Sequence, residues 1–142
     1  DLFMTFNEPI ITSLLWILLF LAQYHEVQDK VRQELLEVSR GETVTMDDFA
    51  NLHYTRATIA ETARIRTLAP TGLPHSVSET ISVEGFTIPK GAMILPLLWA
   101  IHMDPNVHEK PDEFRPGRFL DDEGNFSNRS RSFRFKAVKR EL

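Results

Sequence analysis

The apolar run from Ile10 to Ala22 constrains the fold of this chain more than any other feature, because it contains no charged residue. The run predicts a helix, yet it is shorter than the roughly 20 apolar residues that a membrane-spanning helix needs. We expect Pro9 in the first turn of this helix, with Asn7 or Glu8 as the N-cap. A helix that is apolar on nearly every side is normally buried inside a large protein. The run therefore predicts more protein around it than a chain of 142 residues supplies.

The composition excludes several kinds of site. The chain contains no cysteine, so disulfides and zinc–thiolate centres are excluded. Its net charge is -4 and its one basic run, 129–140, lies near the C-terminus, which argues against a nucleic-acid partner. Hydrophobic residues make up 42% and charged residues 25%, as in an ordinary globular segment, and we expect 1–142 to form a single partial domain. The first residue is not methionine, which suggests a segment cut from a longer chain.

Further helices are predicted downstream of the apolar run. Glu26–Ser39 carries an apolar stripe at helical spacing. Thr45–Asp48 is close to a capping box and predicts a short helix through Leu52. Tyr54–Thr67 is the next helix, and Pro70 prevents it from continuing.

The hydrophobic period changes after the last of these helices. Ile81–Val83 and Phe86–Ile88 alternate between apolar and polar residues, and Glu84–Gly85 joins them as a two-residue turn, so we expect a β-hairpin. From Asp104 to Leu142 the chain is rich in proline and is predicted to be mostly loop. The fold class that follows is α+β, mainly α.

A pair of opposite charges lies on one face of the helix Tyr54–Thr67. Glu61 and Arg64 are three residues apart, and as an exposed pair they would stabilise the helix by only about 0.2–0.5 kcal/mol. Their order in the chain is more informative, because the hairpin and then Arg115–Phe119 follow them. This order resembles the K helix and meander of the cytochrome P-450 family. The resemblance implies that Glu61, Arg64 and Arg118 form a buried structural network of charges, which is stable only when all partners are present.

Neighbouring segments extend the resemblance to microsomal, insect-like members of that family. They are Gly72–His75, Val83–Gly91, Leu98–Pro105 and Lys110–Phe119. The matching histidine in several of those enzymes contacts a haem propionate, so the resemblance implies that His75 binds the cofactor.

The N-terminal segment resembles the second half of the family's I helix, but its oxygen-activation motif is altered. The family has Ala-Gly-x-Glu/Asp-Thr where this chain has Thr5-Phe-Asn-Glu-Pro9. Glu8 is the one catalytic residue of the motif that remains. Phe6 replaces the glycine that leaves space for dioxygen, and Pro9 replaces the threonine and has no hydroxyl group to relay protons.

The last residues resemble the start of the family's haem-binding loop. Phe135, Lys139 and Arg140 match the loop Phe-Gly-x-Gly-Lys-Arg-x-Cys, and the resemblance implies that Phe135 and Arg140 contact haem. Leu142 occupies the position of the cysteine that ligates iron. A leucine side chain has no electron pair to donate to a metal, so no metal ligand is predicted.

The resemblance implies a partial cytochrome P-450 fold of I, J and K helices, small β-hairpin, meander and start of the haem loop, without the N-terminal half and the L helix. The implied function is a fragment of a haem-dependent monooxygenase, which inserts one atom of dioxygen into a lipophilic substrate with electrons from a reductase. The family implies the cytosolic face of the endoplasmic reticulum membrane, with the anchor outside this chain. Leu142 predicts that this chain is inactive.

Two alternatives remain open. The chain is either a non-catalytic relic or binding module derived from that family, or an unrelated mixed α+β domain with an incidental ion pair. The second alternative explains the apolar helix and the long loop poorly.

Overall fold

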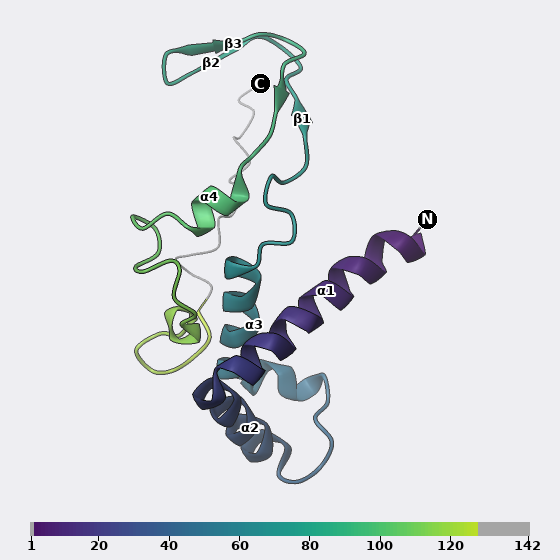
Figure 1. Cartoon of the computed structure of the whole chain (residues 1–142), viewed down its shortest axis with the longest axis vertical. Coiled ribbons are helices and arrows are strands. Elements are labelled where there is room, and N and C mark those ends of the chain that lie inside the picture. Colours follow the sequence, from purple (N-terminus) through teal and green to yellow (C-terminus); the bar gives the residue numbers. More distant parts are fainter. Residues whose placement is uncertain (1, 128–142) are drawn as a thin grey trace.

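Three long helices form the centre of the chain. The computed structural model describes residues 2–127, with side chains from residue 7 onward. Helices α1 (Leu2–Gln23), α2 (His25–Ser39) and α3 (His53–Ile65) lie against one another, and α2 turns back from the end of α1 (Figure 1). The remaining described elements are short, and the fold class predicted from the sequence, mainly α with small β structure, is confirmed.

The short elements are η1 (Asp47–Asn51), β1 (His75–Ser76), β2 (Ile81–Val83), β3 (Phe86–Ile88), β4 (Met93–Ile94), α4 (Leu98–His102) and η2 (Pro116–Phe119). Of these, the strands extend away from the long helices (Figure 1), whereas η1, α4 and η2 contact α2 or α3. The predicted hairpin is present, with β2 antiparallel to β3. Glu84 and Gly85 both have positive φ, 50° and 82°, as a two-residue hairpin turn requires. Strands β1 and β4 form a second antiparallel pair that the sequence did not predict.

The predicted start of the first helix is wrong. Helix α1 begins at Leu2, so Pro9 lies inside it rather than in its first turn, and neither Asn7 nor Glu8 is its N-cap. A proline removes one backbone donor from the helical ladder and leaves the other donors in place. Residues 2–8 contain no glycine and no second proline that would end the helix. The Pro9 carbonyl also accepts a hydrogen bond from the Ser13 hydroxyl at 2.7 Å.

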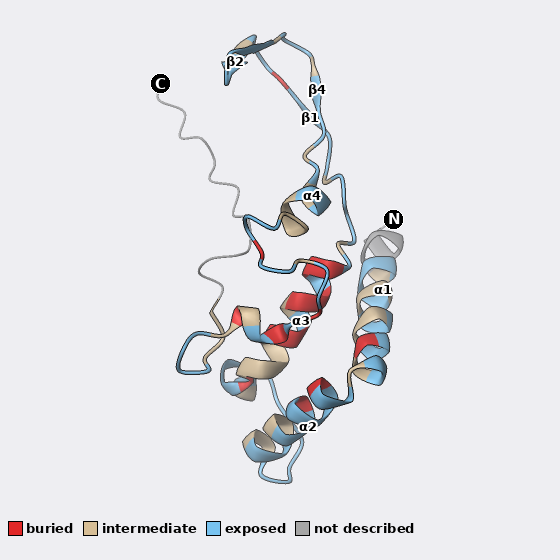
Figure 2. Cartoon of the chain, turned by 60° about the vertical axis from the view of Figure 1, so that its left-hand side comes forward, coloured by how far each residue is buried: buried red, intermediate tan, exposed pale blue. Residues whose placement is uncertain are grey.

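The hydrophobic core lies where α1, α2 and α3 meet the segment before η2. Its buried side chains are Phe20, Val27, Val31, Ile65 and Phe114. The rings of Phe20 and Phe114 stack with centroids 4.4 Å apart and planes 10° apart. Figure 2 shows that buried residues are concentrated along α3. The C-terminal part of α1 therefore contributes to the core together with a residue from almost a hundred positions away.

Most of α1 is exposed in this chain. Six of its large aliphatic side chains are between 53% and 62% exposed: Ile10, Ile11, Leu14, Leu15, Leu18 and Leu19. The helix predicted to be buried on every side is thus covered on one side only (Figure 2). Within the described part of the chain, no single helix has the length and hydropathy to cross a membrane. Helix α1 from Asn7 onward and helix α2 meet these two criteria only when they are taken together, and they are bent by 109° where they join.

A carboxylate from α2 caps the N-terminus of α3. Glu34 Oε1 accepts the Tyr54 N–H at 2.7 Å, and Oε2 accepts the Thr55 N–H at 2.7 Å and the Thr55 hydroxyl at 2.6 Å. The first N–H groups of a helix have no partner within the helix, and a negative charge beside them is favourable. The sequence segment before α3 supplies no such cap, since Leu52 is its N-cap residue.

Replacing Glu34 with glutamine is expected to lower the free energy of unfolding by about 1–2 kcal/mol. Glutamine keeps the length of the side chain but offers one acceptor oxygen in place of two and carries no charge. Urea titration followed by circular dichroism measures the change. The matched control is Glu37→Gln on the exposed side of the same helix, and an equal loss in both variants would contradict the capping role.

Candidate functional site

Glu61 is the centre of a buried network of charges. Its side chain is fully buried on α3, and its carboxylate accepts four hydrogen bonds. Oε2 accepts from Nε of Arg64 at 2.8 Å, and Oε1 accepts from Nη2 of Arg64 at 2.9 Å. Oε1 also accepts from Nε of Arg118 at 2.8 Å and from the backbone N–H of Arg115 at 2.9 Å. One carboxylate thus holds two guanidinium groups from segments more than fifty residues apart.

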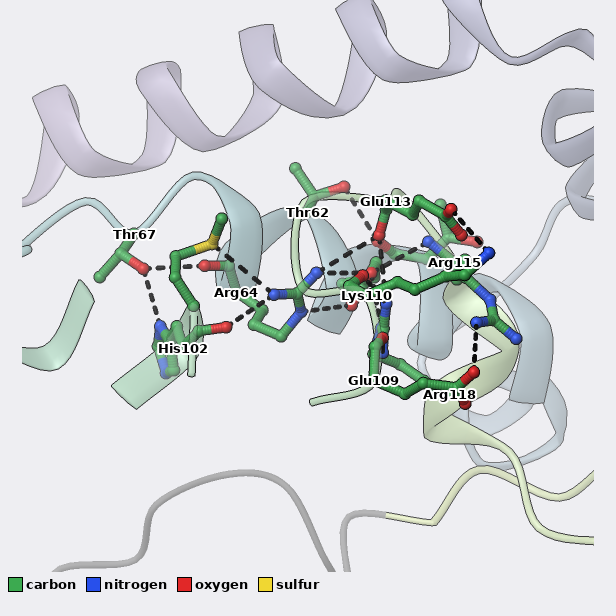
Figure 3. A network of polar contacts seen from close by, with 12 residues as sticks. Thr62, Arg64, Thr67, His102, Glu109, Lys110, Glu113, Arg115 and Arg118 are labelled. Atoms are coloured by element: carbon green, nitrogen blue, oxygen red, sulfur yellow. Dashed lines mark hydrogen bonds and ion pairs between the residues drawn. The ribbon is translucent and has the colours of Figure 1, made fainter. Parts of the chain in front are cut away.

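Arg64 connects Glu61 to the end of α4. Its side chain is only 2% exposed. Besides the two bonds to Glu61, Nη1 donates to the carbonyl of His102 at 2.7 Å and lies 3.9 Å from the sulfur of Met103 (Figure 3). Nη2 donates to the carbonyl of Glu113 at 3.5 Å. Arginine suits this role because its planar fork of donors reaches several acceptors at fixed angles.

Arg118 is the second arginine that binds Glu61. It lies in η2, and its side chain is 3% exposed. Its two terminal nitrogens donate to three backbone carbonyls, those of Glu109 at 3.0 Å, Lys110 at 3.1 Å and Glu113 at 3.2 Å. The loop 103–119 therefore surrounds the two guanidinium groups, and the carbonyl groups of Glu109, Lys110 and Glu113 point toward them.

This arrangement stabilises the fold and is not a set of reactive groups. Both oxygens of the Glu61 carboxylate accept hydrogen bonds, and the two guanidinium groups act only as donors. Buried charges are tolerated only when they are paired and hydrogen-bonded throughout. The network holds the loop 103–119 against α3.

A histidine at the edge of the network is held in one tautomer. Thr67 Oγ1 donates its only hydrogen to the carbonyl of Arg64 at 2.9 Å and lies 2.7 Å from Nδ1 of His102. Nδ1 therefore carries the hydrogen that the hydroxyl oxygen accepts. Burial lowers the pKa of His102, and the positive charge of Arg64 lowers it further. The neutral ring accordingly fits beside a guanidinium group.

The predicted site residues lie in different parts of the chain. The structure brings Glu61, Arg64 and Arg118 together. Glu8 is exposed near the N-terminal end of α1, and His75 is exposed on β1, where it is paired with Ile94. The other three positions, Phe135, Arg140 and Leu142, lie outside the described residues.

Sequence reasoning missed the residues whose backbone completes the network. The carbonyls of His102, Glu109, Lys110 and Glu113 accept from the arginines, and backbone groups leave no residue-type signal in a sequence. It also missed His108, which is fully buried beside the network. The only available signal for His108 was its position between two segments that resemble the family.

The residues of this chain do not provide the ligand that a haem–thiolate centre needs. There is no cysteine in the 142 residues. Among the described residues no group of three or more His, Cys, Asp or Glu side chains is placed to hold a metal ion. The exposed imidazole of His75 has the chemistry to contact a carboxylate group such as a propionate, but this supplies no bond to iron.

Comparison with known proteins agrees with the order of these elements. The family model described as Cytochrome P450 matches residues 1–137. Cytochrome P450 2U1 of Bos taurus and of Homo sapiens are each 40% identical over 141 residues, which is 99% of this chain and 26% of the relative. Cytochrome P450 18a1 of Drosophila melanogaster is 41% identical over 125 residues, which is 87% of this chain and 23% of the relative.

The matches cover only part of the relatives and not quite the whole of this chain. The chain spans about a quarter of the length of the curated relatives it matches. The family model ends at residue 137, so position 142 lies beyond it. Over the matched residues the resemblance seen in the sequence is confirmed, and the chain belongs to the cytochrome P450 family.

Proposed function

We propose that this chain is a segment of a haem-dependent monooxygenase that inserts one atom of dioxygen into a lipophilic substrate. The observation that supports the proposal is the buried network of Glu61, Arg64 and Arg118, found in a chain whose first 137 residues match the cytochrome P450 model. In the whole enzyme a reductase supplies electrons, and the protein lies on the cytosolic face of the endoplasmic reticulum membrane.

In this proposal the segment provides structure and part of the cofactor pocket. Glu61, Arg64 and Arg118 hold the loop 103–119 in place, as their hydrogen bonds indicate. His75, Phe135 and Arg140 contact the haem group. In the whole enzyme that group would supply oxygen activation, and these three residues would hold it.

We further propose that this chain does not catalyse the reaction by itself. Position 142 is leucine, and no other residue supplies a thiolate. In the oxygen-activation segment Pro9 lacks a hydroxyl group, and its carbonyl is engaged by the Ser13 hydroxyl. Glu8 keeps its carboxylate and is exposed, but without a neighbouring hydroxyl it is only a remnant of a proton relay.

Spectroscopy of the purified chain tests this proposal. Haem is added, the sample is reduced, and carbon monoxide is bound. We expect no absorption band typical of a thiolate-bound carbon monoxide complex. The Leu142→Cys variant is the matched comparison, and a thiolate-type band in that variant alone would show that the pocket binds haem and lacks only its ligand. A thiolate-type band in the unsubstituted chain would contradict the inactivity.

A second candidate function is a non-catalytic binding module derived from the same family. The observation in its favour is the exposed aliphatic side of α1, where six side chains are more than half exposed. Sequencing the transcript on both sides of the chain separates the two candidates. An upstream membrane anchor and a downstream Cys-x-Gly favour the enzyme, whereas stop codons favour the module.

A further inference from the structure

His108 is a buried side chain without hydrogen-bond partners. Its exposed fraction is 0%, and neither Nδ1 nor Nε2 has a partner among the described residues. Only its backbone is engaged, since its N–H donates to the carbonyl of Asp104 at 2.8 Å. A neutral imidazole always carries one N–H, so this ring buries one unsatisfied donor and one unsatisfied acceptor.

The charged groups around this ring are mostly positive. Helix α3 contributes Glu61 and Arg64, α4 contributes His102, and η2 contributes Arg118. Two arginines thus share one carboxylate, and burial together with the charge of Arg64 lowers the pKa of the second histidine, His102. Besides Arg118, the charged side chains of the loop 103–119 are Asp104, which is half-buried, and Glu109, Lys110, Asp112, Glu113 and Arg115, which are exposed to solvent.

A proton on His108 would conflict with these surroundings in two ways. It would place a third positive charge beside a single carboxylate, in a region shielded from water. It would also convert the unsatisfied acceptor into a second unsatisfied donor, because both nitrogens of an imidazolium carry hydrogen. Both effects favour an undocked loop, in which the ring reaches water.

We propose that His108 makes the docking of the loop 103–119 onto α3 sensitive to acid, so that protonation of this buried ring releases the loop. Release also removes Arg118 from Glu61, because both the histidine and the arginine lie on the same loop. The loop is consequently a conformational element with a docked state near neutral pH and a released state in acid.

The direction of the pH dependence follows from the two states of the ring. Burial, and then the positive charges of Arg64 and Arg118, lower the pKa of His108 from 6.5 to about 4 in the docked state. A released ring has the ordinary pKa of 6.5 and binds a proton first. The docked state therefore has its full stability above pH 6.5 and loses it progressively as the pH falls from 6.5 toward 4.

Hydrogen exchange of the backbone amides in residues 103–119 tests the proposal in the 142-residue chain. Protection factors are measured at pH 7.5 and at pH 4 in the unsubstituted protein and in His108→Phe, which keeps an aromatic ring but cannot bind a proton. The acid-induced loss of protection is expected to be on the order of a hundredfold larger in the unsubstituted protein. Both proteins share every carboxylate, so the difference isolates His108.

Two outcomes of the exchange experiment would overturn the proposal. The first is an equal loss of protection in both proteins, and the second is a loop already unprotected at pH 7.5, because there is then no docked state to release. If His108→Phe does not fold, His108→Gln takes its place. A nuclear magnetic resonance titration of the His108 ring provides an independent check. A ring that binds its proton near pH 6.5 while the loop stays protected would also contradict the inference.

Discussion

Replacing Glu61 with glutamine is expected to lower the free energy of unfolding by about 3–5 kcal/mol, the cost of removing one partner from a buried set of charges. Glutamine has the same shape but offers one acceptor oxygen, and its amide hydrogens would point at a guanidinium group. Arg64 and Arg118, with side chains 2% and 3% exposed, would then lie buried without a counter-charge. A stability loss of this size exceeds half of the total for a marginal protein.

Equilibrium unfolding in urea, followed by circular dichroism, measures this loss. Glu113→Gln is the matched control, because the Glu113 carboxylate pairs with Lys110 at 3.1 Å on the surface, where both side chains are about half exposed. Such an exposed pair contributes less than about 1 kcal/mol. Equal losses in the two variants would show that the charge of Glu61 is not buried in solution.

The double substitution Glu61→Gln with Arg118→Gln distinguishes a shared network from two independent contacts. The four hydrogen bonds of Glu61 connect both arginines, so removal of the second partner is expected to cost less than removal of either alone. If the losses of unfolding free energy in the two single variants add up in the double variant, Glu61 and Arg118 are not coupled.

The sequence predicted the charged partners of this network but not its neutral ones. Glu61 and Arg64 are three residues apart on a helix, which alone predicts only a surface ion pair. Arg118 follows in an order that resembles the family, and this resemblance was needed to select all three residues. The carbonyl acceptors in the loop depend on the path of the backbone, which no residue type encodes. His108 reads as a surface residue in a polar loop, and only the docking of that loop onto α3 buries it.

The same division holds for the fold. The hairpin β2–β3 was predictable, because its turn and its alternation are local. The pairing of β1 with β4 was not, since two-residue strands leave no pattern and their contact is made across the hairpin. Helix α1 was predicted as a helix, but its start was wrong because the steric rule for Pro9 is a preference and not a prohibition.

Replacing Phe114 with alanine is the second substitution with a large expected effect. Phe114 is 7% exposed, and its ring stacks on Phe20 at 4.4 Å and lies 5.0 Å from the ring of Tyr24. Truncation removes the buried ring and leaves a cavity in the core where α1, α2 and α3 meet the loop, which costs about 3–5 kcal/mol. Thermal and urea unfolding midpoints are expected to fall together. Phe86→Ala is the matched control, because that ring is 75% exposed on β3 and should change stability little.

The comparison of Phe114→Ala with Glu61→Gln decides what holds the loop in place. Phe114 lies between Glu113, whose carbonyl accepts from both arginines, and Arg115, whose N–H donates to Glu61. The apolar and the ionic contacts therefore fix the same few residues of backbone. Each substitution is expected to raise hydrogen exchange across the loop 103–119. The double variant is expected to lose less free energy of unfolding than the sum of the losses in the two single variants. If Phe114→Ala leaves exchange at Arg118 unchanged, the ionic network alone docks the loop, and the aromatic stack only joins α1 to it.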